Sequence, residues 1–126
     1  MIKTIETSKA PKVVGPYSQA IIANKFIFCS GQIGIDPSTE QFAGDTIEEQ
    51  TKQIIINLKE ILNVAGSNLE NIVQTTCYLS DMNDYVLFNK IYGSFFSLHK
   101  PARATVQVSA LPKNAKVEIS IIALIK

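Results

Sequence analysis

The sequence predicts an α+β fold in which two helices pack on one face of a single mixed β-sheet. Strand-like and helix-like segments follow one another in the order three strands, helix, strand, helix, two strands. No repeat, low-complexity tract or interdomain linker interrupts this order, and 126 residues is a usual length for one domain. We therefore predict a single domain over residues 1–126.

Short apolar runs predict three strands in the first quarter of the chain. Residues 2–5 form the first, and the stretch AIIANKFIFCSG at residues 20–31 predicts two strands around a tight turn, with Gly31 ending the second. Gly15 and Pro16 predict a rigid turn from which Tyr17 emerges. The polar stretch DPSTEQFAGD at residues 36–45 is expected to be a surface loop.

Capping residues and apolar periodicity predict two helices. A Thr-x-x-Glu capping box at residues 46–49 begins the first, and Gly66 supplies the left-handed residue that ends it. The second is expected to begin near Asp81 or Asn83 and to end before Pro101. Its apolar side is expected to carry the aromatic residues Tyr85, Phe88, Tyr92 and Phe95.

Three further strands are predicted, one at residues 72–79 between the helices and two near the end of the chain, joined by a hairpin near Lys113. This hairpin would place Glu118 opposite Val108, roughly 15 Å from Arg103 at ~3.3 Å per residue. Arg103 and Glu118 are therefore not expected to touch within one chain. Either each has its own partner, or the two converge across an interface with another copy.

Two helices can cover only one face of this sheet. Apolar residues are expected on the opposite face as well, namely Ile22, Phe28, Val106 and Val108. Because no segment of the chain is left to cover them, the sequence predicts self-association.

Composition argues against several classes of protein. Twelve Lys and Arg residues balance eleven Asp and Glu residues, and no basic run could follow a phosphate backbone, so nucleic acid is a poor candidate partner. The apolar runs are too short to cross a bilayer, and the N-terminal residues lack the continuous apolar stretch of a secretory signal. A cytoplasmic protein without membrane contact is expected.

The sequence offers few residues for metal binding or nucleophilic catalysis. Cys29 and Cys77 each lie in a strand-like apolar run, which favours buried, reduced thiols. His99 is the only histidine, so one chain can assemble neither a tetrahedral metal site nor a histidine-based catalytic triad. No metal site is therefore expected.

Two charged residues lie in unusual places. Glu118 falls between Val117 and Ile119 in a strand so apolar that burial should raise its pKa. Arg103 follows a Pro-Ala turn at the start of a strand, where it could be a solvated strand residue or a ligand-binding one.

The stretch PARATVQVSALPKNAKVEIS, which contains both charges, resembles the signature of the RidA/YjgF family of reactive intermediate/imine deaminases. The blocks GPYSQA, CSGQIGID and YLSDMNDY match the family's other blocks in order. The resemblance implies a chorismate-mutase-like fold assembled as a homotrimer with a central barrel and with active sites between subunits. It also implies hydrolysis of 2-imino acids, formed from 2-aminoacrylate or 2-aminocrotonate, to 2-keto acids and ammonia without metal or cofactor.

The resemblance assigns expected roles to individual residues. Arg103 would bind the substrate carboxylate, Glu118 would activate or orient water, and Tyr17 would line the cleft. Three further residues match positions around the pocket with less defined roles, namely Ser30, Gly31 and Asn89. Thr105 stands near the pocket where some close members carry a cysteine, so regulation through a thiol is not expected at this position.

Two other functions stay open at this point. The same cleft could hold 2-keto acids or related metabolites in a trimeric binding protein without turnover, although Glu118 would then weaken carboxylate binding. A ribonuclease that inhibits translation, as described for some relatives, ranks last because the sequence has no basic aromatic surface.

Overall fold

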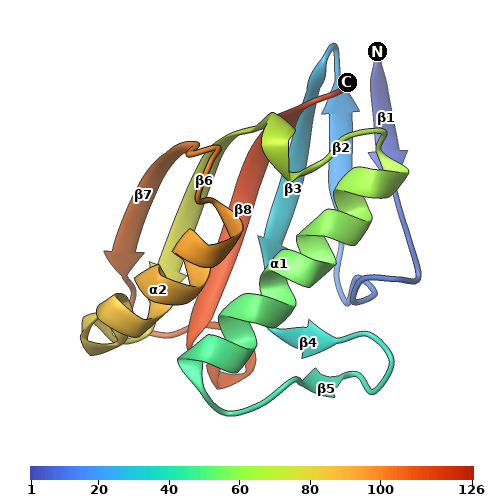
Figure 1. Cartoon of the computed structure of the whole chain (residues 1–126). Coiled ribbons are helices and arrows are strands. Elements are labelled where there is room, and N and C mark those ends of the chain that lie inside the picture. The colour runs from blue at the N-terminus through green and yellow to red at the C-terminus, as the bar shows by residue number, and fades with distance from the viewer.

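A computed structural model describes the whole chain, residues 1–126, and places both helices on one face of a six-stranded mixed sheet (Figure 1). The strand order is β1-β2-β3-β8-β6-β7. These strands are β1 (Ile2–Ile5), β2 (Ala20–Ala23), β3 (Phe26–Gln32), β6 (Ile72–Leu79), β7 (Ala102–Gln107) and β8 (Val117–Leu124). The helices are α1 (Ile47–Val64) and α2 (Tyr85–Phe95). The predicted α+β class, with two helices on one face, is confirmed.

The pairing of the last two strands differs from the prediction. β7 and β8 do not form a hairpin: β7 runs parallel to β6, while β8 lies antiparallel between β3 and β6. Glu118 is therefore opposite Tyr78, not opposite Val108. The physical reason is composition, because a strand that is apolar on both faces fits the centre of a sheet, while β7, with Arg103 and Gln107, fits an edge.

The helix boundaries follow the predicted signals. Thr46 caps α1 by accepting a hydrogen bond from the Glu49 N–H at 3.1 Å, and the Glu49 carboxylate accepts from the Thr46 N–H in return. Gly66 follows the helix with φ of 80°, as a left-handed stop requires. Asp81 caps a short 3₁₀ turn at Met82–Asp84 that leads into α2.

The predicted surface loop at residues 36–45 contains regular structure. β4 (Ile35–Asp36) and β5 (Gln41–Phe42) pair as a small antiparallel hairpin beside α1 (Figure 1). Two strands of two residues are too short to produce an alternating pattern in the sequence, so the hairpin escaped prediction.

The open face of the sheet carries apolar side chains, as predicted, but two of the four residues named for it, Ile22 and Val108, do not lie on it. Phe28 and Val106 are 43% and 45% exposed on this face. Ile22 instead packs against the core, and its neighbour Ile21 pairs with Phe28. Val108 lies beyond the end of β7. In β2 the side chain on the open face is therefore that of Ile21 and not that of Ile22.

The core lies between the sheet and the two helices. In β8 every second residue from Val117 to Ala123 is buried toward the helices. Cys29 and Cys77 are buried free thiols, and burial raises their pKa values to about 12 and about 11. None of the helices combines the length and the apolar character needed to cross a membrane.

Candidate active site

Glu118 is a half-buried carboxylate on the central strand of the sheet. Its neighbours Val117 and Ile119 point into the core, so alternation directs Glu118 to the open face. Partial burial raises the pKa of the Glu118 carboxyl, as expected for a charge in an apolar strand. No hydrogen-bond donor within the chain offsets this cost.

Gly31 makes room for this carboxyl. The register between β3 and β8 shifts between Cys29 and Gln32, which leaves Ser30 and Gly31 in an irregular segment of β3. A Cβ atom at position 31 would lie 2.8 Å from Cδ of Glu118. The sequence predicted that Gly31 ends the strand, but β3 continues to Gln32. The missing side chain instead admits Glu118.

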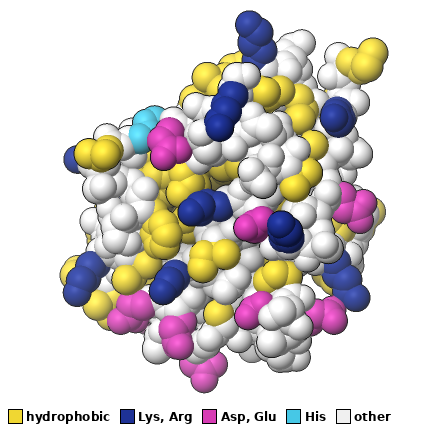
Figure 2. All heavy atoms as spheres, turned by 45° about the vertical axis from the view of Figure 1, so that its right-hand side comes forward, with side chains coloured by type: hydrophobic (Ala, Val, Ile, Leu, Met, Phe, Trp, Pro, Cys, Tyr) yellow, Lys and Arg dark blue, Asp and Glu magenta, His cyan; other side chains and the backbone are white.

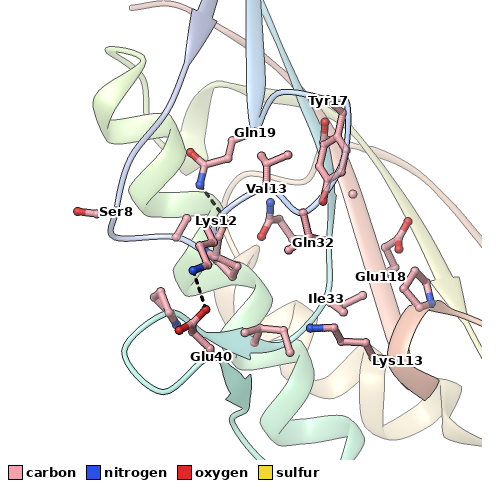
Figure 3. A pocket seen from close by; sticks show the side chains of 18 residues that line it. Ser8, Lys12, Val13, Tyr17, Gln19, Gln32, Ile33, Glu40, Lys113 and Glu118 are labelled. Carbon is pink, nitrogen blue, oxygen red and sulfur yellow. Dashed lines mark hydrogen bonds and ion pairs between the residues drawn. The ribbon is translucent and has the colours of Figure 1, made fainter.

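A cavity of about 650 Å³ opens beside these two residues (Figure 3). Four predicted site residues line it, namely Tyr17, Ser30, Gly31 and Glu118. Tyr17, which is 52% exposed, lines one side of it, and Lys113 lines the other side near Ile33. The Ser30 hydroxyl donates to the Ser18 carbonyl at 2.6 Å, which ties the Tyr17 turn to β3. Ser30 therefore has a structural contact rather than an activating base.

Two contacts shape the wall of this cavity, and neither was predicted. The buried Gln19 side chain donates to the carbonyls of Thr7 and Pro11 and accepts from the Thr7 N–H at 2.7 Å, which fixes the segment before the Tyr17 turn. Lys12 and Glu40 form an ion pair at 3.2 Å across the rim (Figure 3). Gln19 lies in the block GPYSQA, which was the only signal that could have drawn attention to it.

Arg103 belongs to a second group of residues, under α2. Its Nη1 donates to Asn89 Oδ1 at 2.8 Å and its Nη2 donates to the Tyr85 hydroxyl at 2.9 Å. Thr105 follows on the same face of β7, and its Oγ1 is buried without a hydrogen-bond partner in the chain. Of the two alternatives that the sequence left open for Arg103, the structure shows partners within its own chain, because α2 crosses over β7.

The two groups face opposite sides of the sheet. Arg103 is level with Thr75 of β6 and points toward α2, whereas Glu118 is level with Tyr78 and points to the open face. Two strand spacings of ~4.8 Å and three residues of ~3.3 Å separate their Cα atoms by roughly 14 Å. Arg103 and Glu118 therefore do not touch within one chain, as predicted, although the pairing that keeps them apart is different.

Charges of both signs are distributed over the surface of the molecule. Figure 2 shows Lys, Arg, Asp and Glu side chains interspersed among apolar and polar ones, with no continuous basic area on the face in view. This distribution suits a small ligand better than a polyanion.

Comparison with known proteins identifies the family. The sequence model named Endoribonuclease L-PSP matches residues 7–125. The chain belongs to this family, which is also called RidA/YjgF.

Relatives of this RidA/YjgF chain match it over nearly its whole length. A RutC family protein of Pyrococcus abyssi is 49% identical over 121 residues, which cover 96% of this chain and 95% of that protein. The human 2-iminobutanoate/2-iminopropanoate deaminase is 45% identical over 122 residues, which cover 97% of this chain and 89% of that enzyme. The crystal structure of a putative endoribonuclease L-PSP from Entamoeba histolytica is 50% identical, with a TM-score of 0.96 over 99% of this chain and 100% of that one.

Proposed function

We propose that the protein hydrolyses reactive 2-imino acids to 2-keto acids and ammonia, at sites that form between two copies of the chain. The observation that carries the proposal is the separation of Glu118 and Arg103 on opposite faces of the sheet. Glu118 lines the cavity and Arg103 lies under α2, so each belongs to only one half of the proposed site. Neither half contains both residues. The name of the human relative, a 2-iminobutanoate/2-iminopropanoate deaminase, supports this reaction class.

The open face of the sheet supports an assembly of three copies. Aromatic and aliphatic side chains on β3, β7 and β8 stay exposed there, and no segment of residues 1–126 covers them. In a homotrimer the three sheets would enclose a barrel, which buries these side chains. The edge strand β7 of one copy would then lie against the cavity beside β3 of its neighbour, so that Arg103 approaches Glu118 of the other chain.

The chemistry follows from the two halves. The planar Arg103 guanidinium grips the substrate carboxylate through two parallel hydrogen bonds, which fixes the imine carbon in place. Glu118 takes a proton from water while the water oxygen bonds to that carbon and the C=N electron pair moves to nitrogen. Glu118 then returns the proton to nitrogen. The C–N bond breaks, ammonia leaves, and the hydroxyl oxygen forms the keto group as its proton is released.

This reaction needs no nucleophilic side chain, because a protonated imine is already electrophilic. The raised pKa of Glu118 suits the role of a base, since a carboxylate that holds a proton more tightly accepts it from water more readily. A protein that merely binds 2-keto acids would gain nothing from a second negative charge near the ligand.

A coupled assay tests the reaction. A pyridoxal-phosphate-dependent dehydratase generates 2-aminoacrylate from serine, and its decay is followed with and without this protein. We expect faster decay with stoichiometric formation of pyruvate and ammonia. Tight binding of 2-ketobutyrate without faster decay would instead favour the binding protein.

Mixing two inactive variants tests the location of the site. Arg103→Ala and Glu118→Gln chains are unfolded together in equal amounts and refolded. With random assembly, about one site in four would combine the intact Arg103 of one variant with the intact Glu118 of the other, and activity should return to about a quarter of the parental value. Sites within single chains would stay inactive in every mixture.

A further inference from the structure

The guanidinium of Arg103 is held by two side chains from one face of α2. Tyr85 and Asn89 are four residues apart, so both point from the same side of the helix toward β7. Asn89 accepts from Nη1 at 2.8 Å and the Tyr85 hydroxyl accepts from Nη2 at 2.9 Å. Each contact fixes a different end of the guanidinium, and together they prevent its rotation within its own plane.

Three aromatic rings of α2 pack against the same guanidinium. The Cζ atom of Arg103 lies 4.8 Å from the centre of the Tyr92 ring and 5.8 Å from the centres of the Tyr85 and Phe88 rings. Such contacts favour a cation over the ring faces but leave it free to turn, because the attraction has little directional preference in the ring plane. The orientation of the guanidinium therefore depends on the two hydrogen bonds.

A free arginine side chain occupies many rotamers, and a two-point contact with a carboxylate requires one of them. The guanidinium has five N–H donors, of which Tyr85 and Asn89 use two. Three donors are left, which is enough for the two parallel bonds to a ligand. The two internal hydrogen bonds therefore leave enough donors to bind a ligand carboxylate.

We infer that Tyr85 is a positioning residue for the carboxylate site: its hydroxyl fixes the Arg103 guanidinium in the orientation that the ligand requires. This inference rests on the proposed function. A tyrosine at this position looks from the sequence like one more apolar residue of an amphipathic helix, and only the placement of α2 over β7 brings its hydroxyl to Arg103.

The test removes one oxygen atom. Tyr85→Phe keeps the ring beneath the guanidinium and deletes only the hydrogen bond. Ser94→Ala serves as the matched control, because it deletes a hydroxyl on the same helix that bonds only to the Ile91 carbonyl. The first measurement needs no substrate: nitrogen-15 NMR of the Arg103 side chain should show faster rotation about the Cζ–Nη2 bond in Tyr85→Phe and unchanged rotation in Ser94→Ala.

The second measurement is kinetic. In Tyr85→Phe we expect the KM for 2-aminoacrylate and the Kd for 2-ketobutyrate to rise roughly three- to tenfold, which matches the loss of one hydrogen bond, while kcat changes little. In an Arg103→Lys background the same substitution should change either constant by less than about twofold, because a residue that acts through Arg103 has nothing left to position.

Each other outcome overturns the inference in a recognisable way. If the parent is active and Tyr85→Phe leaves KM unchanged, or lowers kcat alone, the positioning role is contradicted. The proposed function stays intact in that case. An equal effect in the Arg103→Lys background shows that Tyr85 acts independently of Arg103. A parent that shows no turnover overturns the proposed function, and with it this inference.

Discussion

The carboxyl group of Glu118 lies in the space that a side chain at position 31 would fill. A Cβ atom on Gly31 would approach Cδ of Glu118 to 2.8 Å. The irregular segment of β3 and the central strand β8 meet at this point, and the cavity opens beside it. The position of the proposed base is therefore linked to the absence of one methyl group on the neighbouring strand.

Gly31→Ala should reduce turnover about a hundredfold, which is the typical effect of moving a reacting group by about 1 Å. The fold should tolerate the change, because the atoms displaced belong to the far end of a flexible side chain and Gly31 has no left-handed backbone conformation. Gly93→Ala is the matched control, since a Cβ at Gly93 meets nothing within 4 Å. It should keep full activity and stabilise α2 by about 0.5–1 kcal/mol. Equal activity of both variants would contradict the link between Gly31 and Glu118.

Glu118→Gln should lower turnover by about two orders of magnitude or more, because glutamine keeps the shape of the side chain but cannot accept a proton from water. Binding of 2-ketobutyrate should persist and should tighten slightly, because one negative charge near the ligand is lost. Calorimetric titration and the coupled assay measure the two effects on the same preparation. A variant with full turnover would assign the base role to another group.

The raised pKa of Glu118 predicts the pH dependence of both activity and stability. Values of kcat/KM should fall as the pH falls through a pKa above the ordinary value of 4.5, since only the ionised carboxyl can act as a base. The folded protein binds this proton more tightly than the unfolded chain, so Glu118 lowers stability as the pH rises through the same range. Glu118→Gln should therefore raise the melting temperature at pH 7. This gain should vanish below about pH 4, where both states are protonated.

Arg103→Ala should weaken carboxylate binding at least tenfold, because a bidentate ion pair in a partly dry site contributes on the order of 2–5 kcal/mol. Arg103→Lys should recover only part of this affinity, since an ammonium lacks the planar two-point contact. The alanine variant should also lose about 1–2 kcal/mol of stability, because Asn89, Tyr85 and the rings of α2 lose the guanidinium. Titration with 2-ketobutyrate and thermal melting separate the two losses.

Asn89→Asp should weaken ligand binding while leaving the fold at least as stable. A carboxylate at this position would form an ion pair with Arg103 Nη1, which now lies 2.8 Å from the Asn89 amide oxygen. The internal charge would compete with the substrate carboxylate for the same guanidinium. We expect a KM increase of about tenfold at low ionic strength and a smaller increase at high salt. A KM that does not depend on Asn89→Asp would mean that the substrate binds elsewhere.

Local signals in the sequence predicted the individual elements well, but they did not predict how the strands are ordered. The Thr46 capping box and Gly66 define α1 because these contacts form within a few residues. The partner of β7 depends instead on contacts between distant segments. A hairpin with β8 was the simplest local solution, and the polar residues of β7, including Gln107, were the overlooked sign of an edge strand.

The candidate site was predicted in the same uneven way. Glu118 and Arg103 could be identified as unusual charges from their apolar surroundings and from the family resemblance. Tyr85 could not be linked to Arg103, because that link requires α2 to cross over β7. Gly31 could not be linked to Glu118, because a shift in strand register leaves no pattern in the sequence.

The strand order also determines how freely each half of the proposed site can move. β8 is hydrogen-bonded along both edges, by β3 and by β6, so its amide hydrogens should exchange with solvent only when the whole domain unfolds. β7 has one unpaired edge, and its amides should exchange through smaller, more frequent openings. The proposed base thus sits on the slowest-exchanging backbone of the molecule. Arg103, the proposed carboxylate binder, lies on an edge strand whose backbone should open more often than that of β8.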